Sequence, residues 1–150
     1  MGARFAHPGT QYDCLYEAEY DHPEGNTTCS QCDRDRLVDR EPRPSSEPVI
    51  HYGLIASGDQ VMRHGTTRDR LRRDQNVLCF EMEAAGLMDT FRCLVIRGIC
   101  DYADSHKNQR WQAYAAVTAA AYAKELLCLV PGSQVIGPQT AGEVRVEPGK

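Results

Sequence analysis

The sequence predicts an α/β fold, and two observations carry this prediction. Short apolar and β-branched runs alternate with segments of helical character between residues 49 and 130. The run 93–100 is almost continuously apolar, which is typical of a strand covered on both faces of a sheet. The order strand, short helix, strand, helix, strand, helix favours a mixed sheet flanked by helices.

Three segments have the composition of β-strands. They are rich in β-branched, aromatic and other apolar side chains, and the first is closed by the turn sequence Ser-Gly-Asp at 57–59. The predicted strands are 49–56, 77–80 and 93–100.

Three further segments are predicted to be helices: 66–73, 81–91 and 109–129. In the last of these, apolar residues recur at three- and four-residue steps and give one continuous stripe. Asn108 is the expected N-cap, and the Pro-Gly pair at 131–132 ends the helix. The residues of the stripe are Trp111, Tyr114, Ala115, Thr118, Tyr122 and Leu126.

The two ends of the chain differ from its middle. Residues 1–48 hold few apolar residues and no sustained period, and three prolines lie between positions 41 and 48. The end of the chain is rich in glycine, proline and polar residues. We therefore predict a loop-rich segment 1–48, an α/β domain 49–130 and a disordered tail 131–150.

Length and composition exclude several classes of function. A chain of 150 residues with 41% hydrophobic residues suits one domain with a real core. The net charge of −4 argues against a nucleic-acid or anionic-membrane partner. No run approaches the roughly 18 apolar residues of a membrane span, and the first twenty residues lack the apolar core of a signal peptide. Seven scattered cysteines fit a reduced setting, so we expect an intracellular, cytoplasmic protein.

Carboxylates gather around the ends of the predicted strands. Glu81 and Glu83 follow the second strand, and Asp101 follows the third. Charged groups at such buried places are costly unless they are paired or used, and in open α/β sheets ligands bind beyond the carboxyl ends of the strands. Glu83 and Asp101 are therefore candidates for chemistry on a small polar ligand. Asp104 and His106, slightly further on, are expected on the surface of a loop.

Each carboxylate also has a purely structural interpretation. Asp101 can cap the segment that follows it, or pair with Arg97 or Arg110. Residues two apart on a strand face opposite sides, so one of Glu81 and Glu83 can reach a ligand while the other pairs internally. We predict that Glu81 pairs with Arg97, because a charge inside an apolar strand needs a partner.

Three motifs occur in order along the predicted domain: Gly-Leu-Ile-Ala-Ser-Gly-Asp at 53–59, Phe-Glu-Met-Glu-Ala-Ala at 80–85 and Val-Ile-Arg-Gly-Ile-Cys-Asp-Tyr-Ala-Asp at 95–104. Together they resemble the nucleoside phosphorylase and nucleosidase superfamily. The resemblance points in particular to the methylthioadenosine/adenosylhomocysteine nucleosidase branch and to the related domain of fungal proteins, which is fused to repeat or NTPase modules. It covers about residues 49–130 and implies the C-terminal half of a phosphorylase-like fold. The implied reaction is cleavage of the N-glycosidic bond of a purine nucleoside by water or phosphate.

The resemblance assigns roles to individual residues. Asp101 takes the place of the general acid that protonates the purine at N7 as the base leaves. Glu83 takes the place of the glutamate that accepts hydrogen bonds from the ribose hydroxyls and favours the positive charge developing on the sugar. Met82 lies where the family packs a methionine beneath the ribose, and Val61 and Met62 lie in the stretch that holds the base.

The same resemblance sets the expected ligands. Glu81 belongs to the motif of Glu83 and is counted with the candidate substrate-binding residues. A small-molecule nucleoside is the expected partner. No metal and no organic cofactor is implied, and phosphate is a candidate co-substrate. A sheet edge left open by a missing half of the fold also allows a homo-oligomer.

The chain departs from the family pattern at several points. Val61 stands where the nucleosidase branch usually places an aromatic ring, and Cys100 replaces the small hydroxyl residue that commonly precedes the catalytic aspartate. Nothing in 1–48 resembles the family's N-terminal half, which carries a glycine-rich phosphate or water site and a further catalytic glutamate. The alternative to an enzyme is therefore a truncated, catalytically inactive nucleoside-binding or regulatory module of a larger protein.

Cys29 and Cys32 form a Cys-x-x-Cys pair in the loop-rich segment. A structural zinc site needs four ligands, and Cys14 and His22 are the nearby residues that can complete one. A redox pair is disfavoured because no βαβ pattern surrounds the cysteines. On sequence alone an ordinary loop with two thiols is the favoured interpretation, and zinc is the minority one.

Overall fold

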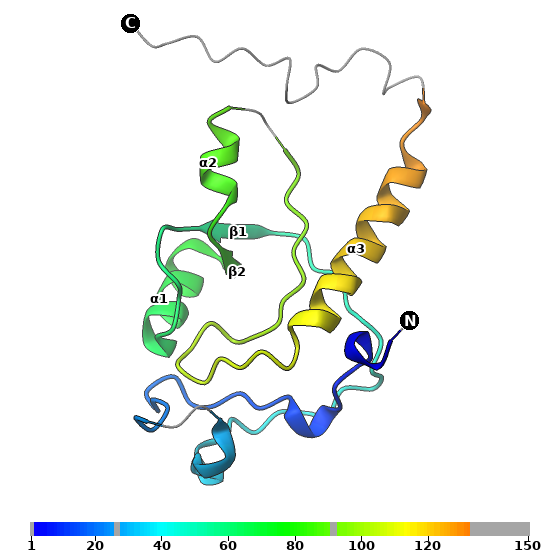
Figure 1. The fold of residues 1–150 in the computed structure, drawn as a ribbon. Coiled ribbons are helices and arrows are strands. Elements are labelled where there is room, and N and C mark those ends of the chain that lie inside the picture. The colour runs from blue at the N-terminus through cyan, green and yellow to red at the C-terminus, as the bar shows by residue number, and fades with distance from the viewer. Residues whose placement is uncertain (1, 26–27, 91–92, 133–150) are drawn as a thin grey trace, which may run out of the picture.

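A computed structural model describes residues 2–25, 28–90 and 93–132, and Figure 1 shows its fold. The predicted tail 131–150 lies outside the described residues from position 133 onward. The chain is α/β, as predicted, with strands β1 (Leu54–Ser57) and β2 (Val77–Glu81) and helices α1 (Gly65–Gln75), α2 (Ala84–Met88) and α3 (Gln112–Leu129). No helix in these ranges is both long and apolar enough to span a membrane.

β1, α1 and β2 form a single parallel unit. β1 pairs with β2 in parallel, with Leu54 opposite Val77 and Ser57 opposite Glu81, and α1 connects the two strands. The helix ends at Asn76, whose φ of 55° lies in the left-handed region that asparagine tolerates. Arg72 and Arg73 lie in its last turn, where their positive charges interact favourably with the negative end of the helix dipole. The predicted helix 66–73 and strand 77–80 are thus confirmed.

The predicted strand 93–100 does not form. Within the described ranges the sheet is a parallel pair, not the mixed sheet that was predicted, and 93–100 pairs with neither strand. Figure 1 shows this segment passing between the strand pair and α3. At Gly98 the backbone lies so close to α3 that a Cβ would stand 2.0 Å from the carbonyl oxygen of Ala115. The predicted burial of the run is wrong as well, because Leu94 is 72% exposed and Ile99 is 51% exposed. A strand also needs a neighbouring edge to pair with.

Two other predicted elements are shorter than their apolar runs. The first strand begins at Leu54 rather than at 49, and the residues before it stay exposed, Tyr52 at 80%. The helix predicted over 81–91 is reduced to α2, because Glu81 still belongs to β2. Residue 91 itself lies outside the described part of the chain.

α3 confirms the predicted apolar stripe, whose residues are all buried or half-buried. The helix starts at Gln112 with Trp111 as its N-cap, so the prediction that Asn108 caps it is wrong. The Asn108 side chain instead accepts a hydrogen bond from the Arg110 N–H at 3.1 Å, in the turn before the helix.

The loop-rich segment packs against the rest of the chain. His7 makes edge-on ring contacts with Trp111 and Tyr114, at centroid distances of 5.0 and 5.1 Å. An isolated antiparallel bridge joins Tyr16 to Leu37. The buried apolar residues of the described part of the chain are few: Tyr16, Cys32, Val77, Ala84 and Ala115. The loop-rich segment supplies the first two of them.

Candidate functional site

The carboxyl ends of β1 and β2 meet at one edge of the strand pair. Ser57 and Glu81 are the last residues of the two strands and stand opposite each other. The N–H of Gly58 donates to the carbonyl oxygen of Glu81 at 3.1 Å, and α2 begins three residues after the strand. This is the edge at which open α/β sheets bind ligands.

Glu81 is buried at this edge, with 6% of its surface exposed. Its Oε2 accepts hydrogen bonds from the N–H groups of Glu83 at 2.9 Å and Ala84 at 2.8 Å. The Ser57 hydroxyl oxygen accepts from the N–H of Ala85 at 3.0 Å. The first turn of α2 would otherwise leave these donors without partners. The two strand ends therefore cap α2 together.

The charge state of Glu81 follows from these contacts. Burial on its own would raise the pKa of this carboxyl. Hydrogen bonds from the Ser57 side chain and from the Glu83 and Ala84 N–H groups outweigh it, helped by the charge of Arg97, and the pKa lies below its ordinary value of 4.5. The ion pair predicted between Glu81 and Arg97 is wrong, because it is absent from the contacts of the described residues and Arg97 acts only at longer range.

Glu83 and its neighbours are presented to solvent. Glu83 is the N-cap residue of α2 and is exposed, and its Oε2 accepts from the Met82 N–H at 3.2 Å. Met82 is itself exposed. On the loop between β1 and α1, Val61 is exposed and Met62 is half-buried.

Asp101 is half-buried in a separate loop. Its Oδ1 accepts from the Ala103 N–H at 2.9 Å and lies 3.3 Å from Nζ of Lys107. The Cys100 thiol donates to its Oδ2 at 3.4 Å. Asp101 therefore caps the turn that follows it, as one structural alternative proposed. Its ion-pair partner is Lys107, which the sequence analysis missed, and not the predicted Arg97 or Arg110.

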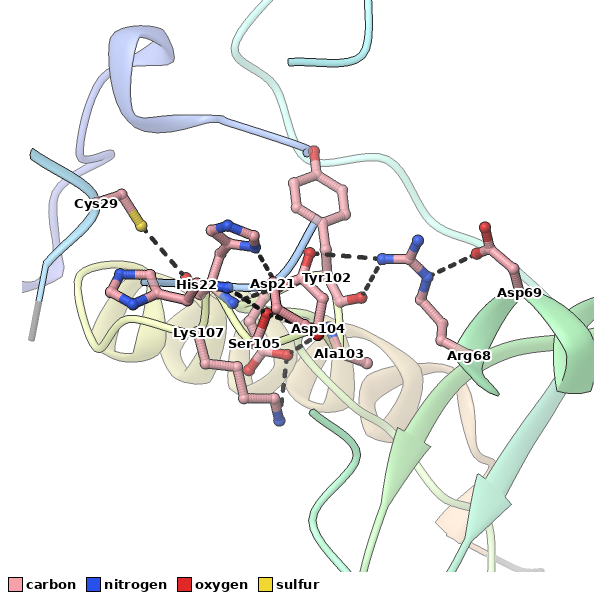
Figure 2. Close-up of polar contacts among 12 residues, drawn as sticks. Asp21, His22, Cys29, Arg68, Asp69, Tyr102, Ala103, Asp104, Ser105 and Lys107 are labelled. Atoms are coloured by element: carbon pink, nitrogen blue, oxygen red, sulfur yellow. Dashed lines mark hydrogen bonds and ion pairs between the residues drawn. The ribbon is translucent and has the colours of Figure 1, made fainter. Parts of the chain in front are cut away.

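The loop that carries Asp101, residues 101–107, is held by α1 (Figure 2). Nη1 of Arg68 donates to the carbonyl oxygen of Tyr102 at 2.9 Å and lies 3.6 Å from Oδ2 of Asp104. Asp104 Oδ1 accepts from the His106 N–H at 2.9 Å. Asp104 and His106 are both buried, so the prediction that they lie on the loop surface is wrong.

The loop-rich segment holds the 101–107 loop from the other side. The Tyr102 hydroxyl donates to Oδ1 of Asp13. Arg40 donates to the hydroxyl oxygen of Tyr102 at 2.6 Å and to Oδ1 of Asp13 at 3.1 Å. Burial, followed by the hydrogen bond to Asp13, raises the pKa of Tyr102 to about 12. The Ser105 hydroxyl accepts from the His22 N–H at 2.9 Å.

The structure brings some of the predicted site residues together and not others. Glu81, Met82 and Glu83 share the strand edge, whereas no hydrogen bond or ion pair of the described chain links Glu83 to Asp101. Two surface hollows are lined by other residues: Asp39, Arg40, Glu41 and Pro42 in one, and Asp69, Arg72, Arg73 and Asn76 in the other.

Comparison with known proteins gives partial matches to nucleosidases. No protein-family model and no solved structure matches the chain. A nucleotide-binding leucine-rich repeat (NLR)-like protein of Hyaloscypha variabilis is 54% identical over 96 residues, which are 64% of this chain and 10% of that protein. A 5'-methylthioadenosine/S-adenosylhomocysteine nucleosidase of Mycobacterium bovis is 31% identical over 90 residues, which are 57% of this chain and 35% of the enzyme.

A third relative is also named as a nucleosidase. The ATP nucleosidase Cap17 of Escherichia coli is 33% identical over 78 residues, 48% of this chain and 15% of that protein. The chain thus spans between about a tenth and about a third of the length of these relatives. The predicted resemblance to nucleosidases is confirmed as distant and partial similarity.

The buried Glu81 makes a prediction about acid stability. Because its pKa is lower in the folded chain than its ordinary 4.5, the ionised form stabilises the fold above that pH. The stabilisation is lost as the pH falls below about 4.5 and through the lower folded pKa. In urea titrations between pH 6 and 3, we expect the stability advantage of the wild type over Glu81→Gln to shrink only in this acid range. Glu19→Gln, at an exposed position, is the control and should show no such trend. If the stability difference between the wild type and Glu81→Gln stays constant over this pH range, the lowered pKa of Glu81 is contradicted.

Proposed function

We propose that this chain supplies the acid-bearing, ribose-binding half of a domain that cleaves the N-glycosidic bond of a purine nucleoside. The observation that carries the proposal is the buried carboxylate of Glu81, which accepts from the Glu83 and Ala84 N–H groups at the carboxyl end of the strand pair. This fixes the backbone of Glu83 where α/β folds bind ligands. The similarity to two proteins named as nucleosidases supports the reaction class.

In this proposal Glu83 binds the sugar. An exposed carboxylate at a rigid helix start can accept hydrogen bonds from two neighbouring ribose hydroxyls. It also attracts the positive charge that the sugar carries as the glycosidic bond breaks. Met82 would pack under the ribose, and Val61 with Met62 would contact the base. Neither of these last two offers an aromatic ring for stacking, so base contacts would be weaker than in relatives that have one.

Asp101 acts on the leaving base. A purine anion is a poor leaving group, and a carboxyl group within hydrogen-bond reach can hand it a proton at N7. The Ala103 N–H and Lys107 hold Oδ1 of Asp101 and so orient the side chain. To act as the acid, the carboxylate must first take up a proton, on Oδ2, and the ion pair with Lys107 is then lost. The 101–107 loop that carries it is tied to α1 and to the loop-rich segment, which would keep the acid in place during the reaction. Phosphate remains a candidate co-substrate, and no organic cofactor is needed.

A second candidate function is a nucleoside-binding module without turnover. It is favoured by the exposure of large apolar residues on both strands, including Leu54 and Leu78. These residues would lie under further structure in a complete domain.

Base release and nucleoside binding separate the two functions. The purified chain is incubated with adenosine, inosine and methylthioadenosine, with and without phosphate, and free base is measured by chromatography. Release of base supports cleavage. Binding by calorimetry without release supports the module, and in either case Glu83→Ala is expected to weaken nucleoside affinity about 10-fold or more through lost charge-assisted hydrogen bonds. Glu125→Ala, on the exposed face of α3, is the matched control. If no nucleoside binds or is cleaved, both proposals are wrong.

A further inference from the structure

Three metal-ligating side chains of the loop-rich segment converge in space. His22, Cys29 and Cys32 each offer one ligand atom, and these three atoms all lie within 4.8 Å of one another. Cys29 begins a short 3-10 turn, Cys29–Gln31, and Cys32 is its C-cap, so the Cys-x-x-Cys spacing is built into a defined turn. Cys32 is buried and the other two are half-buried. None of the three cysteines in this segment is in a disulfide.

We propose that His22, Cys29 and Cys32 bind a structural zinc ion, with Cys14 as the fourth ligand. Zinc bonds of about 2.3 Å to sulfur and about 2.0–2.1 Å to nitrogen put neighbouring ligands of a tetrahedron roughly 3.5–3.8 Å apart. The three atoms therefore need only a small contraction to reach this geometry. Two or three thiolates with one imidazole are a donor set that selects zinc in proteins.

The surroundings of the His22 ring point the same way. Its Nδ1 lies 3.0 Å from the carbonyl oxygen of Pro23 and its Nε2 lies 3.2 Å from that of Thr28. A neutral imidazole has one N–H and can donate to only one of these two acceptors. A zinc-bound histidine coordinates through one nitrogen and commonly donates its other N–H to a backbone carbonyl. Zinc at one nitrogen thus displaces one of the two carbonyl contacts, and the ring donates its remaining N–H to the other carbonyl.

Cys14 is the remaining thiol of the segment, and its sulfur lies outside the cluster in which the three ligand atoms are within 4.8 Å of one another. Its own thiol makes a long contact of 3.7 Å with the carbonyl of Gln11, which it can give up for a metal. His106 is the competing fourth ligand, because its buried ring nitrogens lack hydrogen-bond partners among the described residues and its ring centroid lies 5.4 Å from that of His22.

A zinc ion here would fasten the loop-rich segment to the 101–107 loop. Two of the proposed ligand residues already contact that loop (Figure 2): the backbone N–H of His22 donates to the Ser105 hydroxyl at 2.9 Å, and the Cys29 thiol donates to the His106 carbonyl at 3.7 Å. The first contact is kept when zinc binds, whereas the second ends when Cys29 gives up its proton. A chain with so few buried apolar residues gains much of its order from such a clamp, because metal binding energy becomes folding energy.

Metal content tests the proposal on the whole chain. The wild type, purified in reducing buffer without chelator, is expected to carry about one zinc per chain by mass spectrometry of metals. Cys29→Ser and Cys32→Ser should each lose it, whereas Cys93→Ser and Cys128→Ser, at exposed positions elsewhere, should keep it. A strong chelator should lower the melting temperature of the wild type and leave that of Cys29→Ser unchanged.

Cobalt substitution decides the fourth ligand and keeps the test valid if a variant misfolds. Cobalt added to the metal-free wild type should give the visible bands of a tetrahedral site together with thiolate charge-transfer absorption. If Cys14 is the fourth ligand, Cys14→Ser should reduce the charge-transfer intensity in proportion to the loss of one thiolate of three. If the intensity is unchanged in Cys14→Ser and the tetrahedral bands are lost in His106→Gln, His106 is the fourth ligand instead. A wild type that takes up neither zinc nor tetrahedral cobalt overturns the proposal.

Discussion

Replacing Asp101 by asparagine is expected to lower the rate of base release about 100- to 10,000-fold, the usual contribution of a general acid. The amide keeps the shape of the side chain and can still accept from the Ala103 N–H, but it has no acidic proton to give to the purine. It also loses the ion pair with Lys107, a partly exposed contact that contributes at most about 1 kcal/mol to stability. Nucleoside affinity should therefore change little while turnover falls.

The measurement is single-turnover release of free base by the chain, or by a longer protein that contains it if the chain alone only binds nucleoside. Asp74→Asn, at an exposed position of α1, is the matched control and should leave the rate unchanged. A rate within a few-fold of wild type in Asp101→Asn, with folding intact, would remove this residue from the proposed mechanism.

Replacing Gly98 by alanine is expected to destabilise the fold by about 1–3 kcal/mol, the usual cost of overpacking. A Cβ at this position would stand 2.0 Å from the carbonyl oxygen and 3.0 Å from the Cα of Ala115. Both atoms belong to the backbone of α3, so no side chain can rotate away. The segment 93–100 and α3 must move apart instead.

Urea unfolding followed by circular dichroism measures the effect. Gly86→Ala is the control, because a Cβ there meets nothing within 4 Å and the glycine lies inside α2. That variant should be as stable as the wild type or more stable by about 0.5–1 kcal/mol. Equal stability of Gly98→Ala and wild type would show that 93–100 does not pack on α3 as described.

Local patterns predicted the elements whose signals are local. β2 and α1 follow their apolar and polar runs closely, and the stripe on α3 points inward as its spacing predicted. The apolar run 93–100 misled, because composition carries no information on whether a neighbouring strand edge is available. In the described structure Leu94 and Ile99 of this run are exposed. Similarly, 49–53 has the composition of a strand, but no strand of the described structure pairs with it.

The candidate site was predictable in its residue types and less so in its contacts. Glu81 could have been recognised as a helix cap, since it stands two and three residues before the N–H groups it accepts from. The pairing of Asp101 with Lys107 depends on how the loop turns back after Asp101, which spacing does not reveal. Contacts such as Tyr102 with Asp13 join residues far apart in the chain and leave no signal in a single sequence.

The two-sided hold on Tyr102 has a practical consequence. Composition places a natural boundary at residue 49, and a shortened protein beginning there would look like a sensible design. Such a trimmed version would lose Asp13 and Arg40, which together bind the Tyr102 hydroxyl. Of the contacts that hold the 101–107 loop from other elements, those of Arg68 would remain. The opening third of the chain is therefore best regarded as scaffolding for the residues that follow Cys100, and not as a dispensable leader.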